Sequence, residues 1–231
     1  MDAVKNYVET LKVGRKQEHV NLALLPLMAP DTGVPDYLTL EEALGEGVVL
    51  ITEVSEGGHV PDLKVVNRSP KAVLIVAGEE LVGAKQNRIV NVTILVAGSS
   101  EMVIPVSCVE HGRWAYSSRE FDSGKKMMHA SLRREHYRAV AESQESGGDA
   151  RSDQGMIWDE LAAKSARMGV RSRTGAMADL FEGQRDRLAS ISRPFSWWTA
   201  RLVQLLLSMA RSWGWSVSVT RAPLGGSSRS S

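Results

Sequence analysis

The 231-residue sequence lacks most features that would assign it to a specialised class of proteins. It contains a single cysteine, Cys108, so no disulfide can form within the chain. Its formal net charge of +1 gives no general attraction to nucleic acids or membranes. Residues 1–9 mix charged and apolar side chains and have no apolar run typical of a secretory signal. These absences predict a cytoplasmic protein with no nucleic-acid and no membrane partner, and they leave a small-molecule ligand as the candidate partner.

Signatures of well-known active sites are also missing. The sequence has no P-loop, no G-x-G-x-x-G, no G-x-S-x-G and no H-E-x-x-H. Its five histidines do not have the spacing of metal ligands, and one cysteine cannot make a C-x-x-C pair. The sequence therefore predicts no metal site and identifies no cofactor. It leaves open whether the protein is an enzyme and whether it forms oligomers.

The order of strand-like and helix-like segments predicts a single α+β domain over residues 1–195. Short strand-like runs and short turns alternate between about residues 17 and 120, a spacing typical of antiparallel hairpins. This pattern favours a β-sandwich or an open barrel, followed by a helical segment. The expected strands span residues 19–28 (an edge strand or two pieces, because of Pro26), 48–54, 63–67, 72–77, 79–82, 86–96 and 101–109.

Helical spacing of apolar residues predicts helices over residues 2–13, 125–143, 154–168 and 174–190. Thr39 and Glu42 have the spacing of a capping box, so a short helix should begin after Thr39. The segment between residues 142 and 153 is rich in Ser, Gly and charge, and we expect a loop there.

The tail, residues 196–231, differs in composition from the rest of the chain. It holds four of the six tryptophans and has no Asp or Glu. Its longest uncharged run covers residues 202–210, far short of the roughly 20 residues of a membrane-spanning helix. An interfacial amphipathic helix, with Arg201 and Arg211 on its polar side, is a second interpretation.

A third interpretation, which we favour, is a shifted reading frame. Trp and Met have single codons, so the neighbouring frame can be inferred in part. In that frame Trp213-Gly214-Trp215 reads as an aliphatic residue, Gly and another aliphatic residue. If the leucines use the codon CTG, residues 205–210 read as Ala-Ala-Val, then Asn, Asp, His or Tyr, and then Gly, which is a hairpin signal. We therefore predict that the tail is a non-native product that packs poorly. An early stop codon in the neighbouring frame of the gene would contradict this.

Two carboxylates lie in strand-like runs, where charged residues are unusual. Glu80 and Glu110 could act as an acid–base pair if their separation suited a glycosidic bond. The alternative is that each pairs with Arg88 or Arg113 for structural reasons, and such ion pairs are the more common case. Cys108 lies on the same strand face as Glu110, which favours a buried, unreactive thiol.

The remaining polar residues suggest a ligand. Amide side chains beside a planar guanidinium suit a phosphate, a ribose or the edge of a nucleobase, and they suit the capping of turns equally well. Trp114 could stack on a flat ligand, although an aromatic residue at a strand end is more often core. The predicted ligand-binding residues are Gln86, Arg88, Asn91, Arg113 and Trp114.

Two runs of sequence resemble a known family. Residues 78–88 (GEELVGAKQNR) and 106–114 (VSCVEHGRW) are similar to the ARG and rhodanese-phosphatase-superfamily-associated protein domain, where ARG stands for ADP-ribosylglycohydrolase. The resemblance covers about residues 15–195 and includes the helix around Trp158. Relatives end in a strand–turn–strand like the one in the neighbouring frame, so the printed tail departs from the family. The resemblance implies a role near ADP-ribose or NAD metabolism, and it brings no established reaction or catalytic residue.

Two hypotheses of function follow. In the first, the protein binds or processes a ribosyl-phosphate small molecule related to ADP-ribose or NAD. In the second, it is a non-catalytic interaction or scaffold module whose polar residues knit the strands together. A concave, partly exposed pocket around Glu80, Arg88, Glu110 and Arg113 would favour the first. Burial of these side chains in mutual pairs would favour the second.

Overall fold

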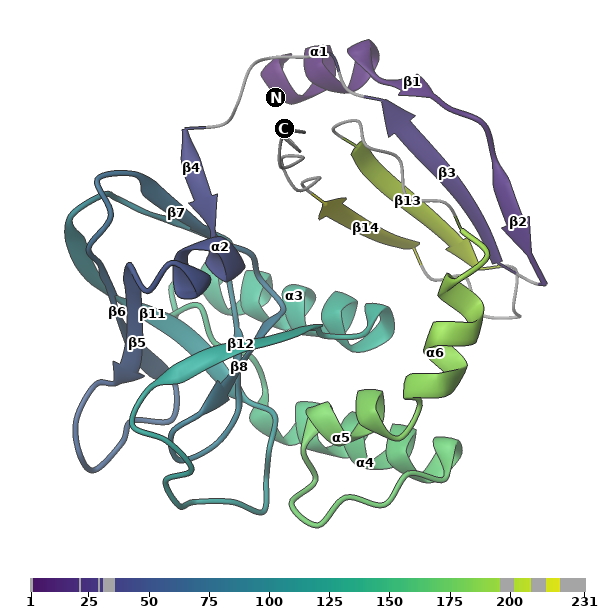
Figure 1. Ribbon diagram of the computed structural model, residues 1–231. Coiled ribbons are helices and arrows are strands. Elements are labelled where there is room, and N and C mark those ends of the chain that lie inside the picture. Colours follow the sequence, from purple (N-terminus) through teal and green to yellow (C-terminus); the bar gives the residue numbers. More distant parts are fainter. Residues whose placement is uncertain are drawn as a thin grey trace, which may run out of the picture. The chain divides into compact units, whose positions relative to one another are not determined.

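The computed structural model describes residues 2–20, 22–28, 30 and 36–195, together with the backbone of two strands, Leu202–Ser208 and Trp215–Thr220 (Figure 1). The chain forms two compact units. One comprises residues 1–34 and 186–231, and the other comprises residues 35–185. Each unit is described by itself below.

The first unit is built around β3 (Leu22–Met28). On one side β3 pairs with β1 (Lys12–Val13) and β2 (Gln17–His19), and on the other side it pairs with β13 (Leu202–Ser208). β13 in turn pairs with β14 (Trp215–Thr220). The expected strand over residues 19–28 is therefore two pieces, and the edge-strand alternative is wrong because β3 has neighbours on both sides.

Helix α1 (Asp2–Thr10) precedes this sheet and ends three residues earlier than predicted, because residues 12 and 13 pair with β3 instead. Of the tail, only β13 and β14 lie within the described residues. The prediction of a shifted reading frame therefore stays a prediction that the gene sequence tests.

The second unit contains a six-stranded antiparallel sheet in the order β12-β8-β9-β11-β6-β5. Its strands are β5 (Val49–Glu53), β6 (Asp62–Asn67), β8 (Glu79–Gly83), β9 (Arg88–Val90), β11 (Ser100–Cys108) and β12 (Phe121–Met127). An isolated bridge between Thr52 of β5 and Glu120, just before β12, links the two outer strands. The sheet thus curls into a half-barrel, which confirms the predicted α+β fold and its open-barrel alternative.

A smaller sheet contains β10 (Ile94–Val96), β7 (Ala72–Ile75) and β4 (Tyr37–Thr39), with β4 parallel to β7. Helix α2 (Leu40–Gly45) follows β4 and begins as predicted. The Thr39 hydroxyl accepts from Glu42 N, and the Glu42 carboxylate accepts from Thr39 N, which satisfies two free N–H groups of the first turn.

The inward-facing residues of the strands form the core inside the curled sheet. In β5 the residues Val49, Ile51 and Glu53 are buried and the residues between them are less so, which is the period-2 pattern of a strand with one inward face. Sixteen apolar side chains form this core, two of them alanines and the other fourteen larger. Several are fully buried, among them Ile51, Leu63, Val65 and Ile104.

Helices α3 (Ala130–Glu145), α4 (Gln154–Met168) and α5 (Met177–Glu182) follow the strands in this unit, and α6 (Arg185–Ser192) leads into the first unit. Apolar residues of α3, α4 and α5 share a second core with Ile89 and Val109 of the β-rich part. No helix among the described residues is long and apolar enough to cross a membrane.

Three predicted segments differ from the structure. Residues 125–127 belong to β12 rather than a helix, because they continue an irregular pairing with β8 in which Lys125 adopts a positive φ of 51°. The strand expected over residues 86–96 is divided into β9 and β10. The helix expected over residues 174–190 is two helices, separated at Gly183 and Gln184.

Candidate functional site

The two resembling runs lie next to each other because β9 pairs with β11, with Arg88 opposite Cys108. The turn before β9 supplies Gln86 and Asn87, and the segment after β11 supplies Glu110 and Arg113. Gly83, at the end of β8, allows the segment before β12 to approach closely. A Cβ atom there would lie 2.5 Å from the Glu120 carbonyl oxygen, and its φ of +132° also favours glycine.

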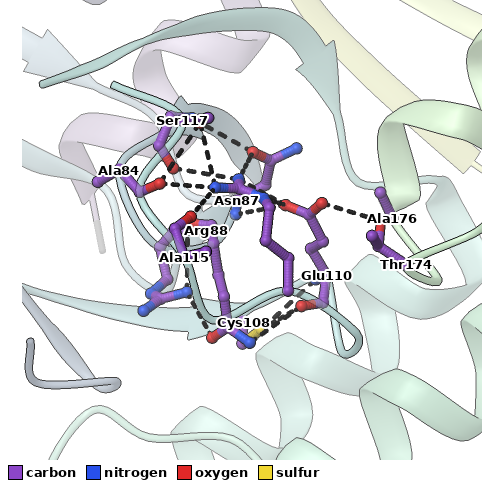
Figure 2. Close-up of polar contacts among 12 residues, drawn as sticks. Ala84, Asn87, Arg88, Cys108, Glu110, Ala115, Ser117, Thr174 and Ala176 are labelled. Carbon is purple, nitrogen blue, oxygen red and sulfur yellow. Dashed lines mark hydrogen bonds and ion pairs between the residues drawn. The ribbon is translucent and has the colours of Figure 1, made fainter. Parts of the chain in front are cut away.

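Glu110 is bonded through both carboxylate oxygens (Figure 2). Oε2 accepts from Asn87 N at 3.1 Å and from Arg113 Nε and Nη2 at 2.9 and 2.6 Å. Oε1 accepts from the Thr174 hydroxyl at 2.9 Å. Burial raises the pKa of Glu110, but the hydrogen bonds from Arg113, Asn87 and Thr174 outweigh it, so the pKa lies below its usual value. Glu110 is therefore held as a carboxylate.

Arg113 has a partner for each of its five N–H donors. Besides Glu110, Nη2 donates to Asn87 Oδ1 at 3.0 Å and to the Gly83 carbonyl at 3.2 Å. Nη1 donates to the carbonyls of Ala84 and Ala115 and to the Ser117 hydroxyl, at 2.6, 2.9 and 3.1 Å. We refer to Glu110, Arg113, Asn87, Thr174 and these carbonyls as the Glu110 network. It ties three separate loops together.

Arg88 and Glu53 form a second pair, which we call the buried pair. Their side chains are 0% and 3% exposed, and Arg88 Nη2 lies 3.8 Å from Glu53 Oε1. Arg88 Nη1 donates to the side-chain and main-chain oxygens of Gln86, at 3.0 and 3.3 Å. Burial lowers the pKa of Arg88, and the nearby Cys108 and Glu53 oppose this.

Arg88 also lies beneath an exposed group of residues. The Arg88 Cζ atom is 5.8 Å from the centre of the Trp114 ring. The Lys85 ammonium is 5.2 Å from the same ring and 5.1 Å from the ring of Tyr116. Both rings are about half exposed, at 50% and 51%. We call Trp114, Tyr116 and Lys85 the aromatic face.

Asn91 stands apart from the other predicted ligand-binding residues. Its Oδ1 accepts from the Ser107 hydroxyl at 2.9 Å, and its Nδ2 donates to the Ala150 carbonyl at 2.8 Å. It therefore fastens the loop before α4 to the sheet. Gln86, by contrast, joins the two pairs, because its Nε2 donates to the Glu110 carbonyl while its Oε1 accepts from Arg88.

Glu80 is 1% exposed, and neither of its carboxylate oxygens has a hydrogen-bond partner among the described residues. Its side chain packs on Gly124, where a Cβ atom would lie 2.8 Å from Oε2. Burial raises the pKa of Glu80 to about 7; Lys126 opposes this, and Glu110 and Asp179 add to it. The alternative that each carboxylate pairs with Arg88 or Arg113 therefore holds for Glu110 but, among the described residues, not for Glu80.

Cys108 is a buried thiol whose pKa is raised by burial. Its main chain is held by the Gln154 side chain, which accepts from Cys108 N at 2.8 Å and donates to Cys108 O at 2.7 Å. Gln154 thus bonds to the edge of β11 as a neighbouring strand would, and it fixes the start of α4. The buried, unreactive interpretation of Cys108 agrees with this environment.

The described residues contain no group of three or more His, Cys, Asp or Glu side chains able to hold a metal ion. A cleft of roughly 530 Å³ lies elsewhere, between α3 and α4. None of the predicted site residues lines it. Its walls are Glu135, Asp153, Gly155, Met156, Asp159, Glu160 and Ala163.

Sequence reasoning missed Glu53, Lys85 and Tyr116 as members of the site, and gave no role to Thr174. The signal for Glu53 was present, because it occupies an inward position in the period-2 pattern of β5, where a carboxylate is unusual. Thr174 could not be found in this way, since only the tertiary structure brings it 64 residues back to Glu110.

Comparison with known proteins identifies the family of the chain. The model of the ARG and Rhodanese-Phosphatase-superfamily-associated Protein domain, ARPP-1, matches residues 10–203, which is most of the chain. The chain belongs to the ARPP-1 family. The resemblance seen in the sequence is thereby confirmed. No curated protein and no solved structure matches the chain.

The ARPP-1 match includes both resembling runs, and hence the Glu110 network, Arg88 and Trp114. Glu110 is buried and Arg113 is partly buried, and the two form a mutual pair, as the scaffold hypothesis requires for them. Glu80 and Arg88 are buried as well, at 1% and 0% exposed, whereas Trp114 in the aromatic face is half exposed. The catalytic and ligand-binding roles of the predicted residues stay predictions.

Proposed function

We propose that this ARPP-1 chain binds a small molecule with ribosyl and phosphate groups, related to ADP-ribose or NAD, at the aromatic face. The observation that carries the proposal is the position of the Lys85 ammonium, about 5 Å from two half-exposed aromatic rings. The association with ARG, the ADP-ribosylglycohydrolases, in the family's name supports the same class of ligand.

Each part of the face suits one part of such a ligand. The Trp114 ring can stack on a nucleobase, which contributes about 1–3 kcal/mol per base in proteins that bind by stacking. Lys85 donates to the Gly57 carbonyl at 2.6 Å, and an ammonium has three N–H donors, so it can also meet a phosphate. The ring of Trp114 lies against Gly58, where a Cβ atom would be 3.3 Å from the ring.

The Glu110 network supports this face from behind. Arg113 donates to the carbonyls of Ala84 and Ala115, which are the neighbours of Lys85 and Trp114 in sequence. In this proposal Arg113, Gln86 and Asn91 position the loops and do not touch the ligand. A binding site held by such a bonded shell keeps its geometry without the ligand.

Of the two predicted catalytic carboxylates, Glu80 has the pKa suited to acid–base chemistry. A general acid or base works best with a pKa near the working pH, and that of Glu80 is raised to about 7 by burial. Glu110 is held ionised by Arg113, Asn87 and Thr174. If the protein turns over its ligand, Glu80 rather than Glu110 is the residue to exchange a proton.

Isothermal titration of the full chain with ADP-ribose tests the binding proposal. We expect saturable binding that Trp114→Ala weakens by about 10- to 100-fold, because stacking is lost. Tyr7→Ala removes a similarly exposed ring from α1 and should leave binding unchanged. An absence of heat with ADP-ribose, NAD and ribose 5-phosphate would overturn the proposal.

A second function, a non-catalytic interaction module, is favoured by the complete bonding of Glu110 and Arg113. Groups whose donors and acceptors are all used within the protein hold a surface in shape and leave nothing for a substrate. A thermal-shift series separates the two functions. An unchanged Tm with ADP-ribose, NAD and ribose phosphates favours the module, and a raised Tm with any of them favours the ligand.

A further inference from the structure

The buried pair has polar atoms that nothing in the described chain satisfies. Both carboxylate oxygens of Glu53, and Nε and Nη2 of Arg88, have no hydrogen-bond partner among the described residues. The nearest approach of the two groups, 3.8 Å, is too long for a hydrogen bond. Buried polar groups in native proteins are nearly always bonded, so a set of four such atoms at one place calls for an explanation.

These atoms have a common geometry. Nε–H and Nη2–H lie on one edge of a guanidinium and point the same way, which is the edge that makes paired hydrogen bonds. Arg113 uses this same edge on Glu110. In Arg88 the corresponding edge offers two donors, and the neighbouring Glu53 offers two acceptors. A carboxylate only accepts and a guanidinium only donates, so the groups that fit both are groups that donate and accept at once.

Hydroxyl groups have this property. A hydroxyl placed between the two side chains donates to Glu53 and accepts from Arg88, and two adjacent hydroxyls would serve both edges. A phosphate does not fit as well, because it would place negative oxygens beside the Glu53 carboxylate. The chemistry of the pair therefore selects a vicinal diol, such as that of a ribose.

The position of the pair connects it to the aromatic face. Arg88 lies in β9 and Glu53 at the end of β5, and both side chains are inside the curled sheet. The half-exposed ring of Trp114 lies 5.8 Å from the buried guanidinium. A ligand whose base stacks on Trp114 would thus have its sugar within reach of the pair once the ring turns aside.

We infer that Glu53 and Arg88 form a diol-binding site beneath Trp114, which recognises the vicinal hydroxyls of a ribosyl ligand. The inference rests on the proposed function and adds to it the residue Glu53 and the group that the site recognises. The base stacks on Trp114, the phosphate meets Lys85, and the ribose hydroxyls bond to Glu53 and Arg88. A site built to bond a hydroxyl discriminates strongly against an analogue without it, because its buried groups are then left unpaired.

The test compares ligands on the unaltered full chain by isothermal titration. The probes are ADP-ribose, its analogue without the 2′-hydroxyl of the adenosine ribose, and ADP, which lacks the second ribose. We expect one of the two altered probes to bind about 100-fold more weakly than ADP-ribose. Weakening by the 2′-deoxy analogue assigns the diol to the adenosine ribose, and weakening by ADP assigns it to the second ribose.

Glu53→Gln adds a second readout. It should weaken the binding of ADP-ribose, so that the altered probe that binds poorly to the unaltered chain binds as tightly as ADP-ribose. Glu56→Gln, at an exposed position three residues away, should change neither affinity. If ADP-ribose, its 2′-deoxy analogue and ADP all bind the unaltered chain with equal affinity, the inference is overturned and the proposed function stands. The ligand comparison needs no variant, so poor folding of Glu53→Gln does not affect it. An absence of binding by ADP-ribose overturns both.

Discussion

Two arginine–glutamate pairs lie in the same unit of this protein, and they differ in how completely their polar atoms are bonded. In the Glu110 network both carboxylate oxygens and all five N–H donors of Arg113 have partners, most of them loop carbonyls, amides and hydroxyls. In the buried pair four polar atoms of Glu53 and Arg88 have none among the described residues. Arginine and glutamate thus stabilise loops in the Glu110 network, whereas in the buried pair they keep unused hydrogen-bond donors and acceptors.

This difference has an energetic meaning. A saturated network recovers the desolvation free energy of its charges through hydrogen bonds. A buried pair without such bonds recovers less, so its contribution to folding is small and a role in binding is a better reason for its presence. Substitutions in and around the two pairs test this contrast.

Arg113→Met should break the Glu110 network. It leaves Glu110 buried without its counter-charge and removes the arginine donors to the Ala84, Ala115 and Gly83 carbonyls. We expect the free energy of unfolding to fall by about 3–5 kcal/mol in urea denaturation. Arg119→Met, at an exposed position in the next loop, should change it by less than about 0.5 kcal/mol. Equal effects of the two would contradict the network's structural role.

Glu80→Gln should reduce the pH dependence of stability. The folded pKa of Glu80 is raised to about 7, above the value of 4.5 for a free Glu side chain, so its neutral form is favoured by folding. Its contribution is therefore complete below pH 4.5 and is lost as the pH rises through 7, a change of about 3 kcal/mol. The amide cannot ionise and should be less affected. Urea denaturation at pH 5 and pH 8 measures this, with Glu145→Gln at an exposed site as the control.

A smaller loss of stability between pH 5 and pH 8 in Glu80→Gln than in the unaltered chain is the expected result. The same loss in both proteins would show that Glu80 is already ionised in the fold, and Glu80 would then have no advantage over Glu110 as a proton carrier.

Gln154→Ala tests whether complete hydrogen bonding stabilises the fold when no charge is involved. Gln154 is an uncharged side chain that bonds to both the N–H and the carbonyl of Cys108. Its loss leaves a strand N–H and carbonyl without partners, and we expect a cost of about 1–3 kcal/mol in urea denaturation. Gln144→Ala, on an exposed position of α3, should be close to neutral. A neutral Gln154→Ala would mean that water replaces the amide at no cost.

The double substitution Glu53→Leu with Arg88→Met should have the smallest effect on stability. Replacing a buried pair by apolar residues of similar size is often neutral or stabilising, so we expect a change within about 1 kcal/mol of the unaltered chain. Glu53→Leu alone should be clearly less stable, since it leaves Arg88 unpaired. A double variant as unstable as Arg113→Met would remove the contrast between the two pairs.

Much of the fold could be predicted from the sequence. The capping box at Thr39, the helix over residues 154–168 and most strands of the curled sheet depend on neighbours within a few positions, and these were predicted correctly. Residues 125–127 were predicted wrongly, because their pairing with β8 outweighs a helical pattern that is local. The site was predicted in part, since Glu110 and Arg113 are three residues apart and do pair.

The sequence by itself determined which segments become strands and helices, and it placed the polar residues at the ends of β8, β9 and β11. Only the tertiary structure decided the partners. Glu53 meets Arg88 because the sheet curls, and Thr174 reaches Glu110 because the segment before α5 returns alongside β11. Strand and helix formation depends on short-range periodicity and capping, whereas the bonding of a buried charge depends on atoms that the whole chain brings together.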